Sequence, residues 1–280
     1  MSFSKHFVDI RILNIKGNLQ RRRRHRVYIV SASLRTRIVH LIGVTMKGVV
    51  IVCVAVFGIA GCSLAPFITP CREQDTACLR ASAQKAVPIL AAGIPEMGIA
   101  TLDPMHVEQV RTSQAGLDMD FRNTSVTGLR NCEVLHCKRH AHSTFVDLKC
   151  SVMLVGNYTL GGKLLIMPID GTGRYAIKIN DIVVKIMFKV GERMMNGNAY
   201  WVVESWKHTS EVQTGAHFLF RNLFHGNKAL SDAVHAFANE NWRDIFQEVA
   251  PPIVKAIVAK IVDESTKLFN KVPIKDLVLQ

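Results

Sequence analysis

Apolar residues recur at helical spacing over residues 74–92. The positions that would form one face of this helix are Leu79, Ala83, Ala86, Val87 and Leu90. Pro88 is expected to kink the helix, because proline cannot donate the backbone hydrogen bond of a regular turn. The sequence Gly93-Ile94-Pro95-Glu96 is typical of a helix end. The pattern therefore predicts one helix that ends before residue 93.

From about residue 117 to 220 the pattern changes to alternation, which is typical of strands with one buried face. In one stretch Val146, Leu148, Cys150, Val152 and Leu154 alternate with Asp147, Lys149 and Ser151; in another, Ile182, Val184, Ile186, Phe188 and Val190 alternate with Val183, Lys185, Met187 and Lys189. The turns are expected at Gly161-Gly162, Gly171-Thr172-Gly173 and Asn196-Gly197-Asn198. Long antiparallel strands joined by tight turns are therefore predicted.

After residue 230 the pattern returns to helix. Asn241 could cap a helix that starts at Trp242 and has Asp244 in its first turn. Pro251-Pro252 should bend this helix. Beyond the bend, an apolar stripe comprises Ile253, Val254, Ile257, Val258, Ile261, Val262, Leu268 and Phe269. The order of helix, long strands and long helix predicts an α+β fold, with a highly curved antiparallel sheet wrapped around a long C-terminal helix.

Such a sheet and helix have two apolar faces that need not pack against each other completely. The gap between them would be an elongated apolar tunnel, in which burial of an apolar ligand is favourable by about 25 cal/mol per Å². The residues expected to line this tunnel are Val146, Leu148, Val152, Leu154, Ile182, Val184, Ile186, Phe188, Phe218, Phe220, Ile257 and Ile261. The alternative is that they fill an ordinary core with no tunnel.

The positive charge of the chain lies mainly at its N-terminus. The formal net charge is +13, and ten of the 35 basic residues but only one of the 22 acidic residues fall within residues 1–45. Residues 46–280 therefore carry 25 basic and 21 acidic residues, close to balance. Composition gives no argument for nucleic-acid binding by the folded region.

Met46-Lys47 is followed by thirteen uncharged residues and then by small residues at Gly61, Ser63 and Ala65. This order predicts a secretory signal peptide over residues 46–65, and the run is shorter than the roughly 20 residues of a membrane span. Cleavage after Ala60 or Cys62 fits better than cleavage after Ala65, which would place a proline next. We interpret residues 1–45 as a basic leader, either an upstream extension outside the true product or an unusually long n-region. A transit peptide, a nuclear localisation run, an uncleaved signal anchor and a lipoprotein cleavage box are the alternatives.

Residues 66–280 are expected to form a single domain with five of the seven cysteines. In an oxidising compartment, Cys71 and Cys78 are expected to form a disulfide, and the odd number leaves at least one free thiol. A bridge between Cys132 and Cys137 is left open, and Cys150 is expected to be a buried thiol. Glycosylation signals occur at Asn123 and Asn157, in keeping with a secreted surface.

Metal and catalytic chemistry find little support in the sequence. Cys132, Cys137, His140 and His142 include zinc-ligand types, but on a strand the two histidines would share a face opposite Cys137. No Gly-x-Ser-x-Gly motif is present, and no nucleophile, base and orienting group stand at a telling spacing. We therefore expect no enzyme activity, no bound metal and no cofactor.

An ordered set of motifs resembles the insect takeout and haemolymph juvenile-hormone-binding family. The set comprises Cys71-x6-Cys78-Leu79, Gly93-Ile94-Pro95-Glu96, Leu102-Asp103-Pro104, Gly156-Asn157-Tyr158, Asn222-Leu223-Phe224-His225-Gly226-Asn227 with Leu230, Asn239-Glu240-Asn241-Trp242 and the prolines before the last helix. It covers roughly residues 70–272. The resemblance implies the tubular lipid-binding fold, in which a curved sheet and a long C-terminal helix enclose an apolar tunnel.

The resemblance also implies a secreted, extracellular carrier of a small hydrophobic ligand, such as a juvenile-hormone-like terpenoid or a fatty acid, with links to circadian or feeding physiology. As partners we expect that ligand alone: no nucleic acid, no stable membrane insertion after signal cleavage, and a monomeric chain. Two departures are evident, because no cysteine follows Cys150 to close a second, longer-range disulfide, and Cys132 and Cys137 are additions to the usual pattern. The alternative function is a secreted surface-interaction protein with a filled core.

Overall fold

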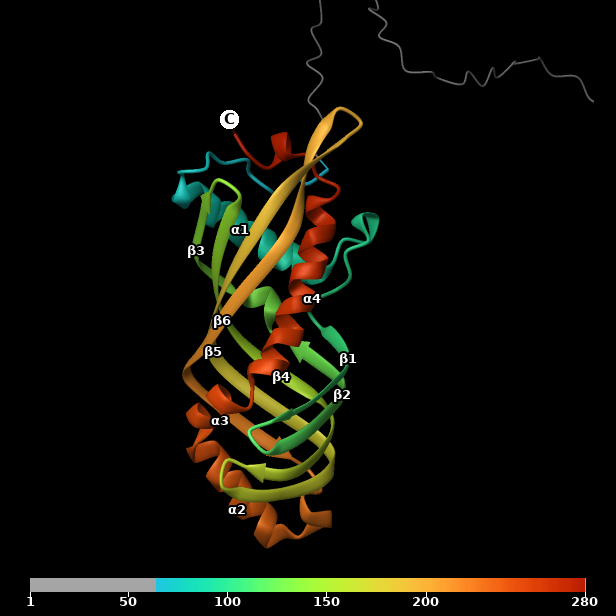
Figure 1. Cartoon of the computed structure of the whole chain (residues 1–280), viewed down its shortest axis with the longest axis vertical. Helices are drawn as coiled ribbons and strands as arrows, with labels where there is room; N and C mark the ends of the chain where they lie inside the picture. The colour runs from blue at the N-terminus through green and yellow to red at the C-terminus, as the bar shows by residue number, and fades with distance from the viewer. Residues whose placement is uncertain (1–63, 280) are drawn as a thin grey trace, which may run out of the picture. The chain divides into compact units, whose positions relative to one another are not determined.

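Three very long antiparallel strands dominate the computed structural model, which describes residues 64–279 (Figure 1). They are β4 (Ser143–Leu164), β5 (Met167–Met195) and β6 (Asn198–Phe220), and the shorter strands are β1 (Met105–Gln114), β2 (Leu117–Thr127) and β3 (Glu133–His140). The strand order is β1-β2-β4-β5-β6, and β3 also pairs with β4. The predicted α+β fold with long antiparallel strands is confirmed, although the first strand begins earlier than the alternation indicated.

Both β2 and β3 pair with the same edge of β4, one after the other along its length. The β2 register runs from Leu117 opposite Gly162 to Thr127 opposite Met153. The β3 register runs from Glu133 opposite Lys149 to the end of the β3–β4 hairpin. This arrangement lets β4 extend through both halves of the curled sheet.

Two of the three predicted turns are wrong. Gly161-Gly162 lies inside β4 and Gly171–Gly173 lies inside β5, so that the chain turns between Leu164 and Met167 instead. The glycines serve close backbone approach: a Cβ on Gly162 would lie 2.4 Å from the carbonyl oxygen of Gly116, and one on Gly173 would lie 2.1 Å from that of Arg221. The third turn, at Asn196-Gly197, is where the sequence predicted it.

The first helix, α1 (Thr76–Ala92), matches the predicted segment, with Pro88 inside it. The carboxylate of Asp75 accepts a hydrogen bond from the Cys78 N–H at 2.9 Å and so caps its first turn. At the other end, Gly93 adopts a positive φ of 84°. Short 3-10 helices span Pro95–Met97, Leu129–Asn131, Phe224–Gly226 and Ile274–Asp276.

The C-terminal helical region is divided into α2 (Lys228–Glu240), α3 (Trp242–Glu248) and α4 (Pro251–Phe269). The expected bend is therefore a break, because Pro251 and Pro252 occupy the first turn of α4, where their missing N–H groups are tolerated. Helix α3 begins at Trp242 directly after Asn241, as predicted, but the Asn241 side chain does not cap it. Its side-chain amide instead donates to the Phe237 carbonyl oxygen at 2.8 Å, at the end of α2.

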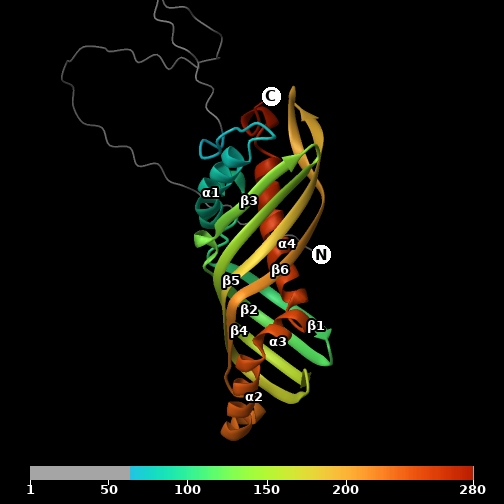
Figure 2. The ribbon, with the colours of Figure 1, turned by 90° about the vertical axis from the view of Figure 1, so that its left-hand side faces the viewer.

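The C-terminal helix α4 contacts both edge strands of the sheet, β1 and β6 (Figures 1 and 2). One polar link on this seam is Lys260, whose ammonium donates to the His106 carbonyl oxygen at 2.7 Å. Helix α1 packs against β3, at the end of the unit opposite α2. The concave face of the sheet is thus covered by α4 and α1, and most of the buried apolar side chains form one cluster between them.

The predicted leader, residues 1–45, and residues 46–63 of the predicted signal peptide lie outside the residues that the structure describes. Among residues 64–279, no helix combines the length and apolarity that crossing a bilayer requires.

Candidate functional site

An elongated cavity of about 380 Å³ lies between the sheet, α1 and α4. Its lining residues on β4 extend from Thr144 to Leu164 and those on β5 from Ile169 to Val190, so that the cavity follows most of both strands. The volume falls within the 300–1,000 Å³ that is usual for pockets that hold small organic ligands. We refer to this space as the tunnel.

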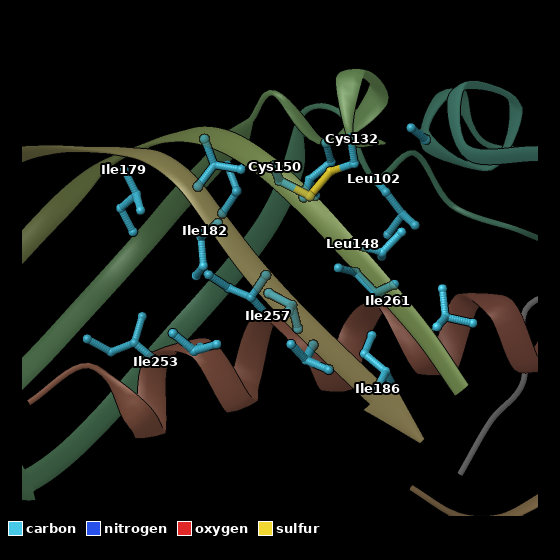
Figure 3. A pocket seen from close by; sticks show the side chains of 18 of the residues that line it. Leu102, Cys132, Leu148, Cys150, Ile179, Ile182, Ile186, Ile253, Ile257 and Ile261 are labelled. Atoms are coloured by element: carbon cyan, nitrogen blue, oxygen red, sulfur yellow. A yellow bond between two sulfur atoms is a disulfide. The ribbon is translucent and has the colours of Figure 1, made fainter. Parts of the chain in front are cut away.

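The structure places all twelve residues predicted from the apolar faces on the wall of the tunnel. They are Val146, Leu148, Val152 and Leu154 of β4, Ile182, Val184, Ile186 and Phe188 of β5, Phe218 and Phe220 of β6, and Ile257 and Ile261 of α4. In Figure 3 the side chains of Ile253 and Ile257 on α4 extend toward those of Ile182 and Ile186 on β5. Strand alternation and helical periodicity therefore direct two apolar surfaces toward one space.

Part of the wall was missed because a bulge changes the phase of β5. The pairing of β5 with β4 and with β6 shifts register just before Ile182, and Asp181 adopts a positive φ of 48°. Before the bulge the odd-numbered residues Ile177 and Ile179 face the tunnel, whereas after it the even-numbered residues do. The alternation of Ile177 and Ile179 with Lys178 and Asn180 was the signal that could have revealed them.

The helices contribute wall residues that the sequence did not assign to the site. From α1, the apolar face that was predicted only as a helical stripe lines the tunnel through Leu79, Ala83, Ala86, Val87 and Leu90. From α3, Ile245 and Phe246 take part. Periodicity identifies the buried face of a helix but says nothing about the element that it covers, which is why these residues were not named.

An aromatic cluster of Phe121, Tyr158, Tyr175 and Phe220 packs where β2, β4, β5 and β6 meet. The Tyr158 hydroxyl donates to the Arg221 carbonyl oxygen at 2.8 Å, and the Tyr175 hydroxyl lies 2.6 Å from the Thr124 hydroxyl. Burial raises the pKa of each tyrosine to about 12, so both stay protonated at physiological pH. Phe121 and Phe220 line the tunnel with phenyl rings, which carry no ionisable group.

Two hydroxyl groups on the wall are satisfied by the protein itself. The Ser82 hydroxyl donates to the Thr69 carbonyl oxygen and accepts from the Thr69 N–H, both at 2.9 Å. The Ser265 hydroxyl donates to the Ile261 carbonyl oxygen, one helical turn back, at 2.8 Å. These groups offer little to a ligand, so the tunnel wall is apolar over nearly all of its surface.

Arg139, on β3, is the one charged residue among the described residues that line the tunnel. Its guanidinium carbon lies 3.9 Å from the ring centroid of Trp201, a buried residue of β6. Burial lowers the pKa of Arg139, and the carboxylates of Glu73 and Glu192 oppose that shift. The sequence interpretation passed over this residue, because one arginine between a lysine and a histidine looks like part of an exposed strand.

Two disulfides hold the elements around the tunnel. One joins Cys71 to Cys78, as the sequence predicted, and closes a loop at the start of α1. The other joins Cys132 to Cys150, so the interpretation of Cys150 as a buried thiol is wrong. The cause is the pairing of β3 with β4: Glu133 lies opposite Lys149, which places the preceding and following cysteines side by side. Cys137 is the free, buried cysteine of the described region.

The cysteine and histidine group considered for zinc does not come together as one cluster. Cys137 is buried on the tunnel wall, whereas His140 and His142 are exposed at the β3–β4 hairpin. Over residues 64–279, no group of three or more potential metal ligands is present. The two predicted glycosylation sites, Asn123 on β2 and Asn157 on β4, are both exposed.

The comparisons with known proteins agree with this architecture. The crystal structure of Epiphyas postvittana Takeout 1 superposes with a TM-score of 0.74 at 27% identity, over 76% of this chain and all of that one. The circadian clock-controlled protein daywake of Drosophila melanogaster is 27% identical over 205 residues, which are 66% of this chain and 77% of that protein.

Two further relatives carry ligand names. The juvenile hormone-binding protein of Manduca sexta is 32% identical over 68 residues, 23% of this chain and 30% of that protein. The putative beta-carotene-binding protein of Schistocerca gregaria is 22% identical over 200 residues, 69% of this chain and 80% of that protein. The sequence model for haemolymph juvenile hormone binding protein (JHBP) matches residues 49–279. This chain, with its curled sheet, α4 and tunnel, belongs to the haemolymph juvenile hormone binding protein family.

Proposed function

We propose that the protein is a secreted carrier that holds a small hydrophobic ligand in the tunnel between the sheet and α4. The observation that carries the proposal is the tunnel itself, a space of about 380 Å³ with a largely apolar wall contributed by five strands and four helices, in which the hydroxyls described above are satisfied internally. A filled core would leave no such space, and protein interiors contain few voids larger than a water molecule. The alternative of a surface-interaction protein without ligand is therefore disfavoured.

The twelve predicted residues are proposed to contact the ligand, and the ligand class is a terpenoid, a fatty acid or a similar lipid. The wall favours such molecules because burial of apolar surface contributes about 25 cal/mol per Å² and requires no specific polar partner. The names of the Manduca and Schistocerca relatives point to the same class of ligand. The carrier function involves no catalytic step, no cofactor and no nucleic acid.

Secretion is supported by two disulfides, which persist in oxidising compartments. We propose that the signal peptide is removed before the folded domain begins. Ala65 is 1% exposed and belongs to the buried cluster, which favours cleavage after Ala60 or Cys62 over cleavage after Ala65. In the mature extracellular chain, Asn123 and Asn157 would be accessible to glycosylation on the outer surface of the sheet.

A role in circadian or feeding physiology is proposed from the daywake relative, whose name describes it as clock-controlled. Measurement of the protein level in the secreting tissue through a light–dark cycle tests this part separately. A daily oscillation that persists in constant darkness supports it, and a flat level contradicts it.

Native mass spectrometry of the protein purified from its secreting tissue tests the carrier proposal. We expect a mass excess over the glycosylated chain that disappears after organic extraction, with the extracted molecule identified as a lipid. The extracted protein should then bind an apolar fluorescent probe with a stoichiometry of one. A chain without any mass excess, which also fails to bind the probe, would contradict the proposal and favour a surface-interaction protein.

A further inference from the structure

Arg139 lies at one end of the tunnel, near the hairpin turn that joins β3 to β4. It pairs with Thr144, which also lines the tunnel and marks its limit along β4. The guanidinium lies over the indole of Trp201, and this indole packs edge-on against Phe269 near the end of α4, with ring centroids 5.7 Å apart. The flat aromatic face holds the cation in one orientation at the tunnel wall.

The described structure does not satisfy this cation. Its Nε and Nη1 atoms are buried and have no hydrogen-bond partner among the described residues. Glu73 and Glu192 raise its pKa from a distance, but neither forms an ion pair with it within 4.0 Å, and the Glu73 carboxylate instead accepts from the Ala141 N–H. A buried donor without a partner destabilises the folded state, and more so when it is charged.

The two buried carboxylates among the described residues are paired, in contrast to the buried nitrogens of the half-buried Arg139. Asp103 accepts from the Arg130 N–H at 2.8 Å, and its carboxylate lies 3.6 Å from the Arg130 guanidinium. Glu264 accepts from the Ala100 N–H at 2.8 Å and from the Lys267 ammonium at 2.8 Å. Elsewhere, the buried Nε of Arg122 has the Asp120 carboxylate at 3.9 Å. Within residues 64–279, only Arg139 combines missing partners with a place on the tunnel wall.

We propose that Arg139 binds the carboxylate of an amphiphilic ligand whose hydrocarbon chain lies in the tunnel, so that the preferred ligands are long-chain carboxylic acids. This assignment rests on the carrier function proposed above. A carboxylate supplies both the missing acceptors and the missing counter-charge, and guanidinium groups pair with carboxylates through two parallel hydrogen bonds. From Arg139 the chain of the ligand would pass between β5 and α4, where the wall is apolar apart from the internally bonded Ser265 hydroxyl.

The test compares hexadecanoic acid with its methyl ester, because the two share the chain and differ in the charge of the head. Displacement of a fluorescent probe from delipidated protein gives both dissociation constants. For the native chain we expect the acid to bind at least tenfold more tightly than the ester, the factor that corresponds to one hydrogen bond to a charged group. Arg139→Met should weaken the acid about tenfold and leave the ester within twofold.

The matched control is Arg243→Met. Arg243 also lies over an indole, that of Trp242 at 4.6 Å, but it is exposed on α3 and does not line the tunnel. We expect this variant to bind the acid and the ester with the affinities of the native chain. Arg139→Lys keeps the charge but loses the planar pair of donors, so it should retain only part of the preference for the acid. If Arg139→Met does not fold, the acid-to-ester preference of Arg139→Lys decides whether Arg139 binds the carboxylate.

Three outcomes separate this assignment from the carrier function. Equal affinities of the native chain for acid and ester would overturn the role of Arg139 and leave the carrier function standing. If both Arg139 variants kept the full preference for the acid, the role of Arg139 would likewise be overturned and the carrier function would stand. Failure of the native chain to bind either the acid or the ester would overturn the carrier function together with the assignment.

Discussion

Replacement of Ile186 by tryptophan tests whether the space beside β5 is open to a ligand. Ile186 is 3% exposed and lines the tunnel on the β5 side, with α4 on the other side (Figure 3). In a filled core the larger ring would overpack the site and lower the free energy of unfolding by about 1–3 kcal/mol. In the tunnel the ring can enter existing space, so the stability should stay within about 0.5 kcal/mol of the native chain.

The cost should instead be seen in ligand binding. An indole ring in the tunnel displaces about three to four methylene groups of a bound chain, and each buried methylene contributes about 0.8 kcal/mol. The loss is about 3 kcal/mol, or roughly two orders of magnitude in the dissociation constant. The assay is therefore a pair of measurements, denaturant unfolding of the ligand-free protein and the affinity for an apolar probe.

Ile99→Trp is the matched control, since Ile99 is 2% exposed but does not line the tunnel. This variant should lose about 1–3 kcal/mol of stability from overpacking. Any loss of probe affinity should not exceed what the reduced folded fraction explains. If Ile186→Trp is as destabilising as Ile99→Trp and binds the probe with native affinity, the reasoning about the tunnel is refuted at this position.

Three further predictions concern the Cys132–Cys150 disulfide, the glycines of the long strands and the thiol of Cys137. Replacement of Cys132 and Cys150 by alanine should lower the free energy of unfolding by about 3 kcal/mol, because the disulfide closes a loop with a sequence separation of 18 residues; an unchanged denaturation midpoint would contradict this. Gly173→Ala should lower the free energy of unfolding by about 1–3 kcal/mol or more, because the new Cβ would lie 2.1 Å from a carbonyl oxygen. Gly161→Ala, which has nothing within 4 Å of the new Cβ, should be neutral or slightly stabilising. Equal effects of the two variants on stability would show that the close approach at Gly173 is not a constraint. Cys137 should resist alkylation at pH 8 in the folded protein and react increasingly as the pH rises toward 11, because burial raises its pKa to about 11 and only the thiolate is nucleophilic; rapid labelling at pH 8 before unfolding would refute its burial.

The fold and much of the tunnel wall could be predicted from local pattern, because a strand directs alternate side chains to one face. Val184, Ile186 and Phe188 are found on the inner face for that reason. The pattern failed where the backbone departs from regular geometry. The bulge before Ile182 changes which alternate residues of β5 face the tunnel, from odd-numbered to even-numbered. A strict alternation counted back from Ile182 therefore does not include Ile179.

Features that depend on which elements become neighbours could not be predicted from local pattern. The Cys132–Cys150 disulfide requires β3 to pair with β4 in one register, and that register is set by a long-range contact. The glycines of β4 and β5 look like turn residues, although Gly162 is needed where another chain segment approaches closely. Arg139 carries no sequence signal of burial, because its position depends on Trp201 of β6.

A crystal structure of the delipidated protein soaked with a brominated long-chain fatty acid tests the central claim most directly. The anomalous signal of bromine locates the hydrocarbon chain without any assumption about its conformation. We expect a bromine on the terminal carbon to lie in the tunnel between β5 and α4, near Ile182 and Ile257, with the carboxylate toward Arg139. Bromine signal confined to the outer surface, with the tunnel empty at saturating ligand, would contradict the claim that this cavity is the binding site.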